Sequence, residues 1–247
     1  MKTYSLHTIC CIGIFMMCSL SSNGQVLISI LLGDKLNSGK IEFGLDGGYS
    51  LASLGGIDPS KGASNFNLGF YFDFATKDPS WFVSTGVRVK STMGASGIAV
   101  YSLDNENLDN VFATGSITRK LSYFNVPFMM KYMFKNQLYA QAGIQVGLRY
   151  KGTDVFLNSV NDDEDLSYKA NVKNDYHPLD GGLCMGLGYR FIKGNGMNLG
   201  LQYYLGMVDV RISDASPEEF NRTLYVNVGI PIGKGKAAAK AGEAPNE

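Results

Sequence analysis

Residues 138–150 read LYAQAGIQVGLRY, and this stretch decides the fold. Every second residue, from Leu138 to Tyr150, is apolar or aromatic, whereas the residues between them include Gln141 and Arg149. Because successive side chains of a β-strand point to opposite faces, the stretch predicts a strand with one apolar and one polar face. Such a strand fits a transmembrane barrel, in which lipid lies outside and polar groups lie inside.

The same alternation recurs along the chain. It predicts an all-β fold, a closed antiparallel transmembrane β-barrel of about eight strands. The predicted strands are 41–51, 66–74, 81–91, 121–134, 138–150, 183–191, 197–207 and 224–232. Two prolines, Pro127 and Pro231, fall inside these strands, where they cannot donate a ladder hydrogen bond, so we expect a local bulge or a gap in pairing.

The predicted connections alternate in length. Short ones at 75–80, 135–136 and 192–196 separate long ones at 52–64, 92–120, 152–179 and 210–221. Outer-membrane barrels have short periplasmic turns and longer external loops. We therefore expect both termini in the periplasm of a Gram-negative cell and the long loops outside.

Aromatic residues gather at both ends of the predicted strands, as they do where lipid meets water. We assign Phe43, Phe74, Trp81, Tyr132, Phe134, Tyr189 and Phe191 to the periplasmic rim and Tyr49, Phe66, Phe124 and Tyr150 to the opposite rim. The alternative is a soluble barrel or sandwich with scattered aromatics.

The N-terminus resembles an export signal. Lys2 precedes an apolar run from Ile9 to Leu20, and small residues follow as far as Gly24. This order predicts a signal peptide over residues 1–24. The alternatives are an uncleaved anchor, for which the run is shorter than the ~20 residues of a span, and a lipoprotein modified at Cys18.

Cleavage would leave Cys184 as the one cysteine of the mature chain, so no internal disulfide is expected. Residues 25–39 would then form a periplasmic N-terminal segment before a barrel over 40–233. Its apolar part, 26–32, either tucks into the periplasmic mouth or docks a partner as a strand or helix. The Ala-, Lys- and Gly-rich tail 234–247 is expected to be disordered and periplasmic.

Three segments carry a family likeness: 33–44 (GDKLNSGKIEFG), 123–132 (YFNVPFMMKY) and 228–232 (VGIPI). With them the mature chain resembles the PorT-type outer-membrane β-barrel family. The resemblance implies an outer-membrane barrel and, for some relatives, a role in protein secretion linked to gliding. One departure is that such barrels end on an aromatic residue, whereas here a tail follows Gly233.

Charged residues also fall on the predicted inward face. The acids Glu42, Asp46 and Asp73 are expected to pair with the bases Arg88, Lys90, Lys131, Arg149 and Arg190. A charged conduit is one reading. A packed salt-bridge network without an open pore is the favoured one, because about eight strands enclose an interior that side chains just fill.

Little in the sequence indicates catalysis or a cofactor. His177, with Asp175 and Asp180 nearby, could serve a barrel enzyme, but a solvated loop histidine is favoured. The acidic stretch 161–165 lacks the spacing of a calcium loop, and Cys184 is expected to fill the interior. We predict no catalytic, cofactor-binding or metal-binding residues.

The favoured function is a non-enzymatic outer-membrane barrel that scaffolds or docks a secretion or envelope complex. The alternatives are an outer-leaflet enzyme or a small-molecule or lipid binder, and a passive structural or adhesive barrel. Expected partners are outer-membrane lipids or lipopolysaccharide, the barrel assembly machinery, and secretion-complex or periplasmic proteins. Nucleic acid is not expected, because Lys plus Arg equal Asp plus Glu at 22 each.

Overall fold

The computed structural model describes residues 40–57, 61–161, 164–191, 196–213 and 217–232. The predicted signal peptide, the N-terminal segment 25–39 and the tail 234–247 lie outside the described residues.

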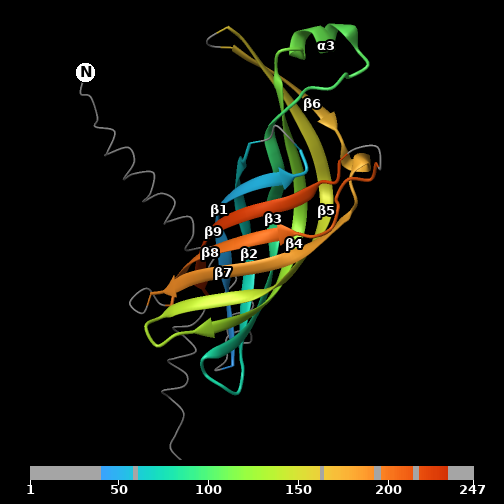
Figure 1. Cartoon of the computed structure of the whole chain (residues 1–247). Helices are drawn as coiled ribbons and strands as arrows, with labels where there is room; N and C mark the ends of the chain where they lie inside the picture. The colour runs from blue at the N-terminus through green and yellow to red at the C-terminus, as the bar shows by residue number, and fades with distance from the viewer. Residues whose placement is uncertain (1–39, 58–60, 162–163, 192–195, 214–216, 233–247) are drawn as a thin grey trace, which may run out of the picture.

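Nine antiparallel strands make up the sheet in the described part of the chain. They are β1 (Ile41–Gly55), β2 (Ala63–Ala75), β3 (Trp81–Ile98), β4 (Ser116–Met133), β5 (Leu138–Asn161), β6 (Glu164–Asn171), β7 (Leu179–Arg190), β8 (Asn198–Gly206) and β9 (Phe220–Pro231). Eight of them form a ring in the order β4-β3-β2-β1-β9-β8-β7-β5, which a β4–β5 pairing closes. The predicted closed barrel is therefore confirmed (Figure 1).

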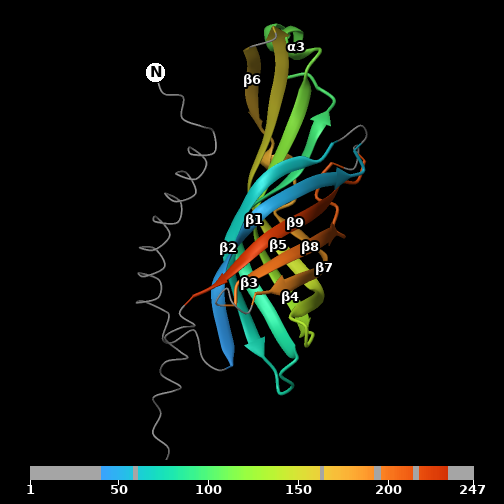
Figure 2. The same cartoon turned by 90° about the vertical axis from the view of Figure 1, so that its left-hand side faces the viewer.

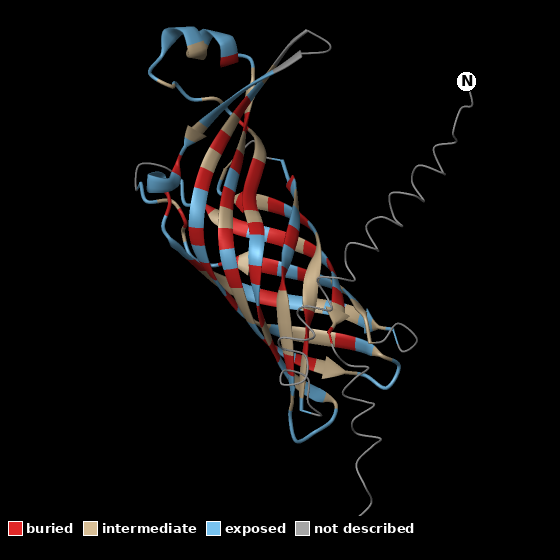
Figure 3. Ribbon diagram, turned by 180° about the vertical axis from the view of Figure 1, so that it is seen from behind, coloured by how far each residue is buried: buried red, intermediate tan, exposed pale blue. Residues whose placement is uncertain are grey.

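Alternating burial along the strands follows the predicted two faces. On β5, Ile144 is 52% exposed on the outside, whereas the neighbouring Gln145 is 1% exposed and faces the interior. The β4–β5 register places Phe128 beside Ile144, so outward apolar side chains lie side by side on adjacent strands. Figure 3 shows the resulting bands of buried and exposed residues along the wall.

Several strands continue beyond the ring. Residues 92–98 of β3, 116–121 of β4 and 152–161 of β5 pair in order, and β6 adds to the far side of β5. We call this protruding sheet the extension; it rises above the barrel in two perpendicular views (Figures 1 and 2). The prediction of loops over 92–120 and 152–179 is thus wrong for most of these residues.

The physical reason is that the two faces exchange character in the extension: apolar side chains point inward and polar side chains point outward. Met93, Ile117 and Phe156 are apolar but point inward and are fully buried, whereas Lys120 and Lys169 point outward. Above the lipid, water contacts the outer face, so apolar side chains pack on the inner face. A prediction that requires apolar residues on the outer face therefore makes β3, β4 and β5 too short.

One short helix, α3 (Glu106–Phe112), caps the extension on the connection from β3 to β4. Asn105 is its N-cap, and the Asn105 Oδ1 accepts hydrogen bonds from the backbone N–H groups of Asn107 and Leu108. Phe112 packs on Phe156 with ring centroids 5.9 Å apart. No helix among the described residues is long and apolar enough to cross a membrane. A 3₁₀ turn, η2 (Lys173–Asp175), leads from β6 toward β7.

Pro127 produces the expected gap in pairing. The β3–β4 ladder joins Thr85 to Phe128 and resumes where Arg88 pairs with Asn125, so in this described ladder Pro127 has no partner on β3. The Thr85 hydroxyl donates instead to the Pro127 carbonyl oxygen at 2.8 Å. At Pro231 the expected bulge or gap does not occur, because Pro231 is the last residue of β9 and pairs with Gly44 on β1 without a register shift.

Candidate functional site

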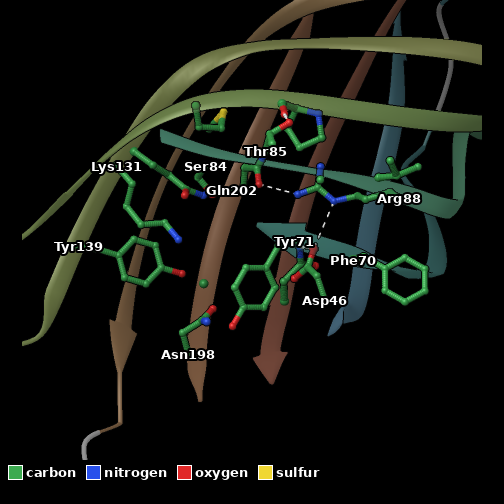
Figure 4. Close-up of a pocket in the computed structure, with 17 residues that line it drawn as sticks. Asp46, Phe70, Tyr71, Ser84, Thr85, Arg88, Lys131, Tyr139, Asn198 and Gln202 are labelled. Atoms are coloured by element: carbon green, nitrogen blue, oxygen red, sulfur yellow. Dashed lines mark hydrogen bonds and ion pairs between the residues drawn. The ribbon is translucent and has the colours of Figure 1, made fainter. Parts of the chain in front are cut away.

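Arg88 is buried in the barrel interior and contacts four other strands. Its Nη1 donates to Gln145 Oε1 at 2.8 Å, and its Nη2 donates to Gln202 Oε1 at 2.6 Å (Figure 4). The Arg88 Nε lies 3.5 Å from Asp46 Oδ2, and the guanidinium carbon lies 4.4 Å from the centroid of the Tyr225 ring. These partners belong to β1, β5, β8 and β9, so one side chain connects opposite walls.

Two further ion pairs lie in the interior. Lys131 Nζ donates to Asp73 Oδ2 at 2.7 Å. Arg190 pairs with Glu42, whose other carboxylate oxygen accepts a hydrogen bond from the Tyr71 hydroxyl at 3.1 Å. Each of the three acids expected inside therefore lies beside one of the expected bases.

The space left between these side chains is small. A cavity of about 60 Å³ is lined by Asp46, Tyr71, Arg88, Lys131 and Gln202, among others (Figure 4). Several buried polar atoms of described residues have no hydrogen-bond partner within the chain, including Asn125 Oδ1, Gln145 Nε2 and Asn227 Oδ1. The cavity has room for a few water molecules, which would satisfy Asn227 Oδ1 on its lining, but small-molecule sites usually need about 300 Å³ or more.

Lys90 does not lie in the interior, and that prediction is wrong. One extra residue between Arg88 and Ser91 forms a bulge in the β3–β4 ladder. A bulge shifts the alternation by one position. Arg88 and Ser91 consequently both point inward and are buried, whereas Lys90 is exposed and its Nζ lies 5.5 Å from the centroid of the Phe66 ring.

Arg149 is buried at the end of the barrel next to the extension, and backbone carbonyl groups accept its hydrogen bonds. Its Nη2 donates to the Tyr176 oxygen at 2.6 Å, and its Nε donates to the His177 oxygen at 3.2 Å. Arg149 thereby holds the connection between η2 and β7 across the mouth of the barrel.

Beyond Arg149, a second polar network closes the mouth of the barrel next to the extension; we call it the mouth cluster (Arg119, Asp154, Tyr176, Arg211 and Glu219). Arg119 forms two hydrogen bonds with Asp154, at 2.9 and 2.7 Å, and a salt bridge of 3.3 Å with Glu219. The Tyr176 hydroxyl donates to Glu219 Oε2 at 2.8 Å and accepts from Arg211 Nη1 at 3.0 Å. The cluster joins β4 and β5 to the connections that precede β7 and β9.

Sequence reasoning missed the mouth cluster because all five residues fall in predicted long loops or next to them. Arg119 and Asp154 are directly paired in the β4–β5 register, so an earlier start for β4 and a later end for β5 would have placed them together. Tyr176, Arg211 and Glu219 carry no strand periodicity, and no sequence signal identifies them.

The extension has an open pocket of about 300 Å³ beneath α3, lined by residues that include Tyr101, Leu103, Phe112 and Phe156. The Tyr101 hydroxyl donates to Asp154 Oδ2 at 3.2 Å. Burial, assisted by the Asp154 charge, raises the pKa of Tyr101 to about 12, so this hydrogen bond persists at neutral pH.

The helix beside this pocket is held by Asp109. Hydrogen bonds from the Ser102 hydroxyl and the Leu103 N–H lower the pKa of Asp109, so its carboxylate stays ionised. Both carboxylate oxygens of Asp109 therefore accept hydrogen bonds from the loop that precedes α3.

The residues considered for catalysis do not come together into a site in the described part of the chain. His177 is exposed, and its backbone N–H donates to the Val210 oxygen at 2.8 Å. Asp180 is buried and accepts a hydrogen bond from Asn221 Nδ2 at 2.9 Å. No hydrogen bond joins the His177 ring to Asp175 or Asp180 among these described residues.

Two other candidate positions remain, the acidic stretch and Cys184. Of the acidic stretch 161–165, residues 162–163 lie outside the described residues, and no metal-binding cluster of His, Cys, Asp and Glu occurs among those that are described. Cys184 is buried in the interior, where its Sγ accepts a hydrogen bond from Gln202 Nε2 at 3.1 Å.

Aromatic residues form contacts at both strand ends. At the end with short turns, Trp81 lies 4.9 Å from Tyr132 between ring centroids, Tyr132 lies 4.9 Å from Phe134, and Tyr189 lies 5.2 Å from Phe191. At the other end Phe124 lies 4.6 Å from Tyr150. Tyr49 and Phe74 are exposed on the outer wall, whereas Phe43 is buried against Phe70 and Phe72.

Comparison with known proteins gives one family match. The model of the family described as outer membrane protein beta-barrel domain matches residues 33–211, more than half of the chain. No curated protein sequence matches.

Among solved structures, the attachment invasion locus protein Ail of Yersinia pestis is 14% identical, with 77% of this chain and 97% of that chain covered and a TM-score of 0.38. The outer membrane protein OprG of Pseudomonas aeruginosa is 11% identical, with 78% and 96% covered and a TM-score of 0.41. Neisserial surface protein A is 10% identical, with 77% and 96% covered and a TM-score of 0.38.

Replacing Arg119 by methionine (Arg119→Met) should destabilise the protein by about 3–5 kcal/mol, because Asp154 and Glu219 would remain buried without a counter-charge. The measurement is the urea midpoint of unfolding in detergent. Lys120→Met is the matched control, since this neighbour is exposed and its loss should change stability by less than about 0.5 kcal/mol. Equal midpoints for the two variants would contradict the assigned role of the mouth cluster.

Proposed function

The chain belongs to the outer membrane protein beta-barrel domain family, and on that premise we propose that it is a non-enzymatic scaffold of the outer membrane. Its barrel anchors the extension at the cell surface, and the extension docks another component of the cell envelope. Both termini lie in the periplasm.

The observation that carries this proposal is the extension itself. It is a sheet whose inner face carries buried apolar residues, among them Met93, Ile117 and Phe156, and these are continuous with the apolar side chains inside the barrel. It also presents apolar side chains beyond the apolar band of the barrel: Val111 on α3 is 41% exposed and Leu166 on β6 is 42% exposed. Exposed apolar groups on an ordered surface favour contact with a protein partner.

The barrel interior argues against a passage for solutes. Arg88 contacts four other strands across the interior, the mouth cluster bridges the outer end, and the cavity between the walls measures about 60 Å³. Water-filled porins have about 16 to 18 strands. A ring of eight strands packed in this way serves as an anchor.

The asymmetry of the two ends supports the proposed orientation. The turns at residues 76–80 and 134–137 are short, whereas the extension and α3 stand at the opposite end (Figure 1). In outer-membrane barrels the larger end faces outward. The extension therefore belongs outside the cell.

The resemblance to PorT-type barrels narrows the proposed partner. It supports a docking role in a complex linked to protein secretion, with the barrel assembly machinery as the partner during insertion. The chain as a whole is neutral, which gives no electrostatic attraction for nucleic acid.

Reconstitution into planar bilayers tests the sealed interior. Purified protein should give no current steps above those of a protein-free membrane, because charged and polar side chains fill the barrel. Heat-denatured protein controls for detergent leaks. Steps that scale with the amount of folded protein would contradict the anchor role.

Cysteine labelling of intact cells tests the orientation. Asn107→Cys, on the exposed face of α3, should react with a membrane-impermeant maleimide on intact cells. Lys77→Cys, in the exposed turn between β2 and β3, should react only after the outer membrane is permeabilised. The native Cys184 is buried and should stay unlabelled. The reverse pattern would place the extension in the periplasm.

A photo-reactive amino acid tests docking. Introduced at Val111 in living cells, p-benzoylphenylalanine should give a discrete protein adduct upon illumination, since Val111 lies on the exposed surface of the extension. The same residue introduced at Leu187, which is 64% exposed on the outer wall of the barrel, is the control and should give no such adduct. Adducts that are absent at Val111, or identical at both sites, would contradict docking through the extension.

A further inference from the structure

The outer face of β5 changes from apolar to basic at a single position. Its outward residues are apolar or aromatic from Leu138 to Tyr150, and the next outward residues are Lys151 and Thr153. At a rise of about 3.3 Å per residue and a tilt of about 40°, the apolar part spans about 30 Å along the barrel axis. That length matches the hydrocarbon core of a bilayer, so Lys151 lies at the level of the lipid headgroups.

Two adjacent strands change at the same level. On β4 the outward row ends with Phe124 and continues with Ser122 and Lys120. On β3 it ends with Val89 and continues with Lys90 and Thr92, because the bulge turns Lys90 outward. The registers align these positions, since Ser122 pairs with both Thr92 and Lys151.

Aromatic rings mark the boundary beneath these lysines. Lys90 Nζ lies 5.5 Å from the centroid of the Phe66 ring. Tyr150, which immediately precedes Lys151, lies 4.6 Å from Phe124 between ring centroids. Aromatic girdles of this kind mark the edge of the apolar band in outer-membrane barrels. We call Lys90, Lys120 and Lys151 the lysine girdle.

The lysine girdle forms no salt bridge within the described part of the chain. All three lysines are exposed. Their outward neighbours are neutral hydroxyl residues: Thr92, Ser122 and Thr153. Cations on adjacent strands repel one another, so an anionic partner would stabilise the arrangement.

We infer that the lysine girdle binds the phosphate groups of a phosphorylated glycolipid in the outer leaflet, the chemistry of lipid A. Three ammonium groups with hydroxyl donors between them suit a headgroup that carries several phosphate oxygens. This inference depends on the proposed orientation, because the outer leaflet faces the girdle only if the extension lies outside the cell.

The test uses purified full-length protein in nanodiscs of phosphatidylcholine. Each sample is doped with one of three lipids: bisphosphorylated lipid A, the same lipid A with its phosphates removed, or phosphatidylglycerol. Native mass spectrometry counts the lipid that each protein retains after release from the disc. The variants are Lys90→Gln/Lys120→Gln/Lys151→Gln, the corresponding triple arginine variant, and the control Lys77→Gln/Lys135→Gln at the opposite end.

Wild-type protein and the control should retain bisphosphorylated lipid A. The triple glutamine variant should lose at least about tenfold in retention, because each lysine near an anionic headgroup contributes about fivefold. The triple arginine variant should retain the lipid. A heat-shift assay on gels verifies that every variant is folded.

Equal retention of dephosphorylated lipid A, or of phosphatidylglycerol, by the wild type would overturn the assignment to lipid A phosphates. Unchanged retention by the triple glutamine variant would overturn the role of the girdle. These outcomes do not depend on cellular orientation. Labelling of Lys77→Cys on intact cells would instead contradict the orientation while leaving lipid binding in nanodiscs intact.

Discussion

The constraint on which the structure depends is that lipid offers no hydrogen bonds to a peptide backbone. A sheet inside a bilayer must therefore satisfy each strand edge with another strand. The pairing of β4 with β5, continuous from Ser116–Leu157 to Met133–Tyr139 apart from one bulge, closes the ring and removes its edges. Only β6, which belongs to the extension, pairs on one side alone among the described strands, where water can satisfy its free edge.

Closure at eight strands has a consequence for the interior. Side chains from opposite walls come within hydrogen-bond distance, as Arg88 does with Gln145 and Gln202. A buried guanidinium is tolerated only where acceptors surround it. The interior is therefore polar but filled, and the parts of the protein available for contact are the outer wall, the turns and the extension.

The membrane boundary organises that outer surface. Below it, apolar residues such as Ile144 face lipid; above it, Lys151 and Lys120 face headgroups and water, and the apolar residues Ile117 and Phe156 turn inward. The alternation of side chains thus adapts the same strands to lipid below the boundary and to water above it. One strand pattern, continued across the boundary, produces both an apolar outer wall and a sheet with a buried apolar inner face.

The alternation in the sequence determined the eight ring strands, their faces and the interior positions of Glu42, Asp46, Asp73 and Arg88, because each depends on a local period of two. The tertiary structure alone decided the rest. The bulge after Arg88 that turns Lys90 outward depends on how β3 pairs with its neighbours. The mouth cluster brings Arg119 to Glu219, 100 residues away in the chain, and no local period encodes a contact between segments so distant.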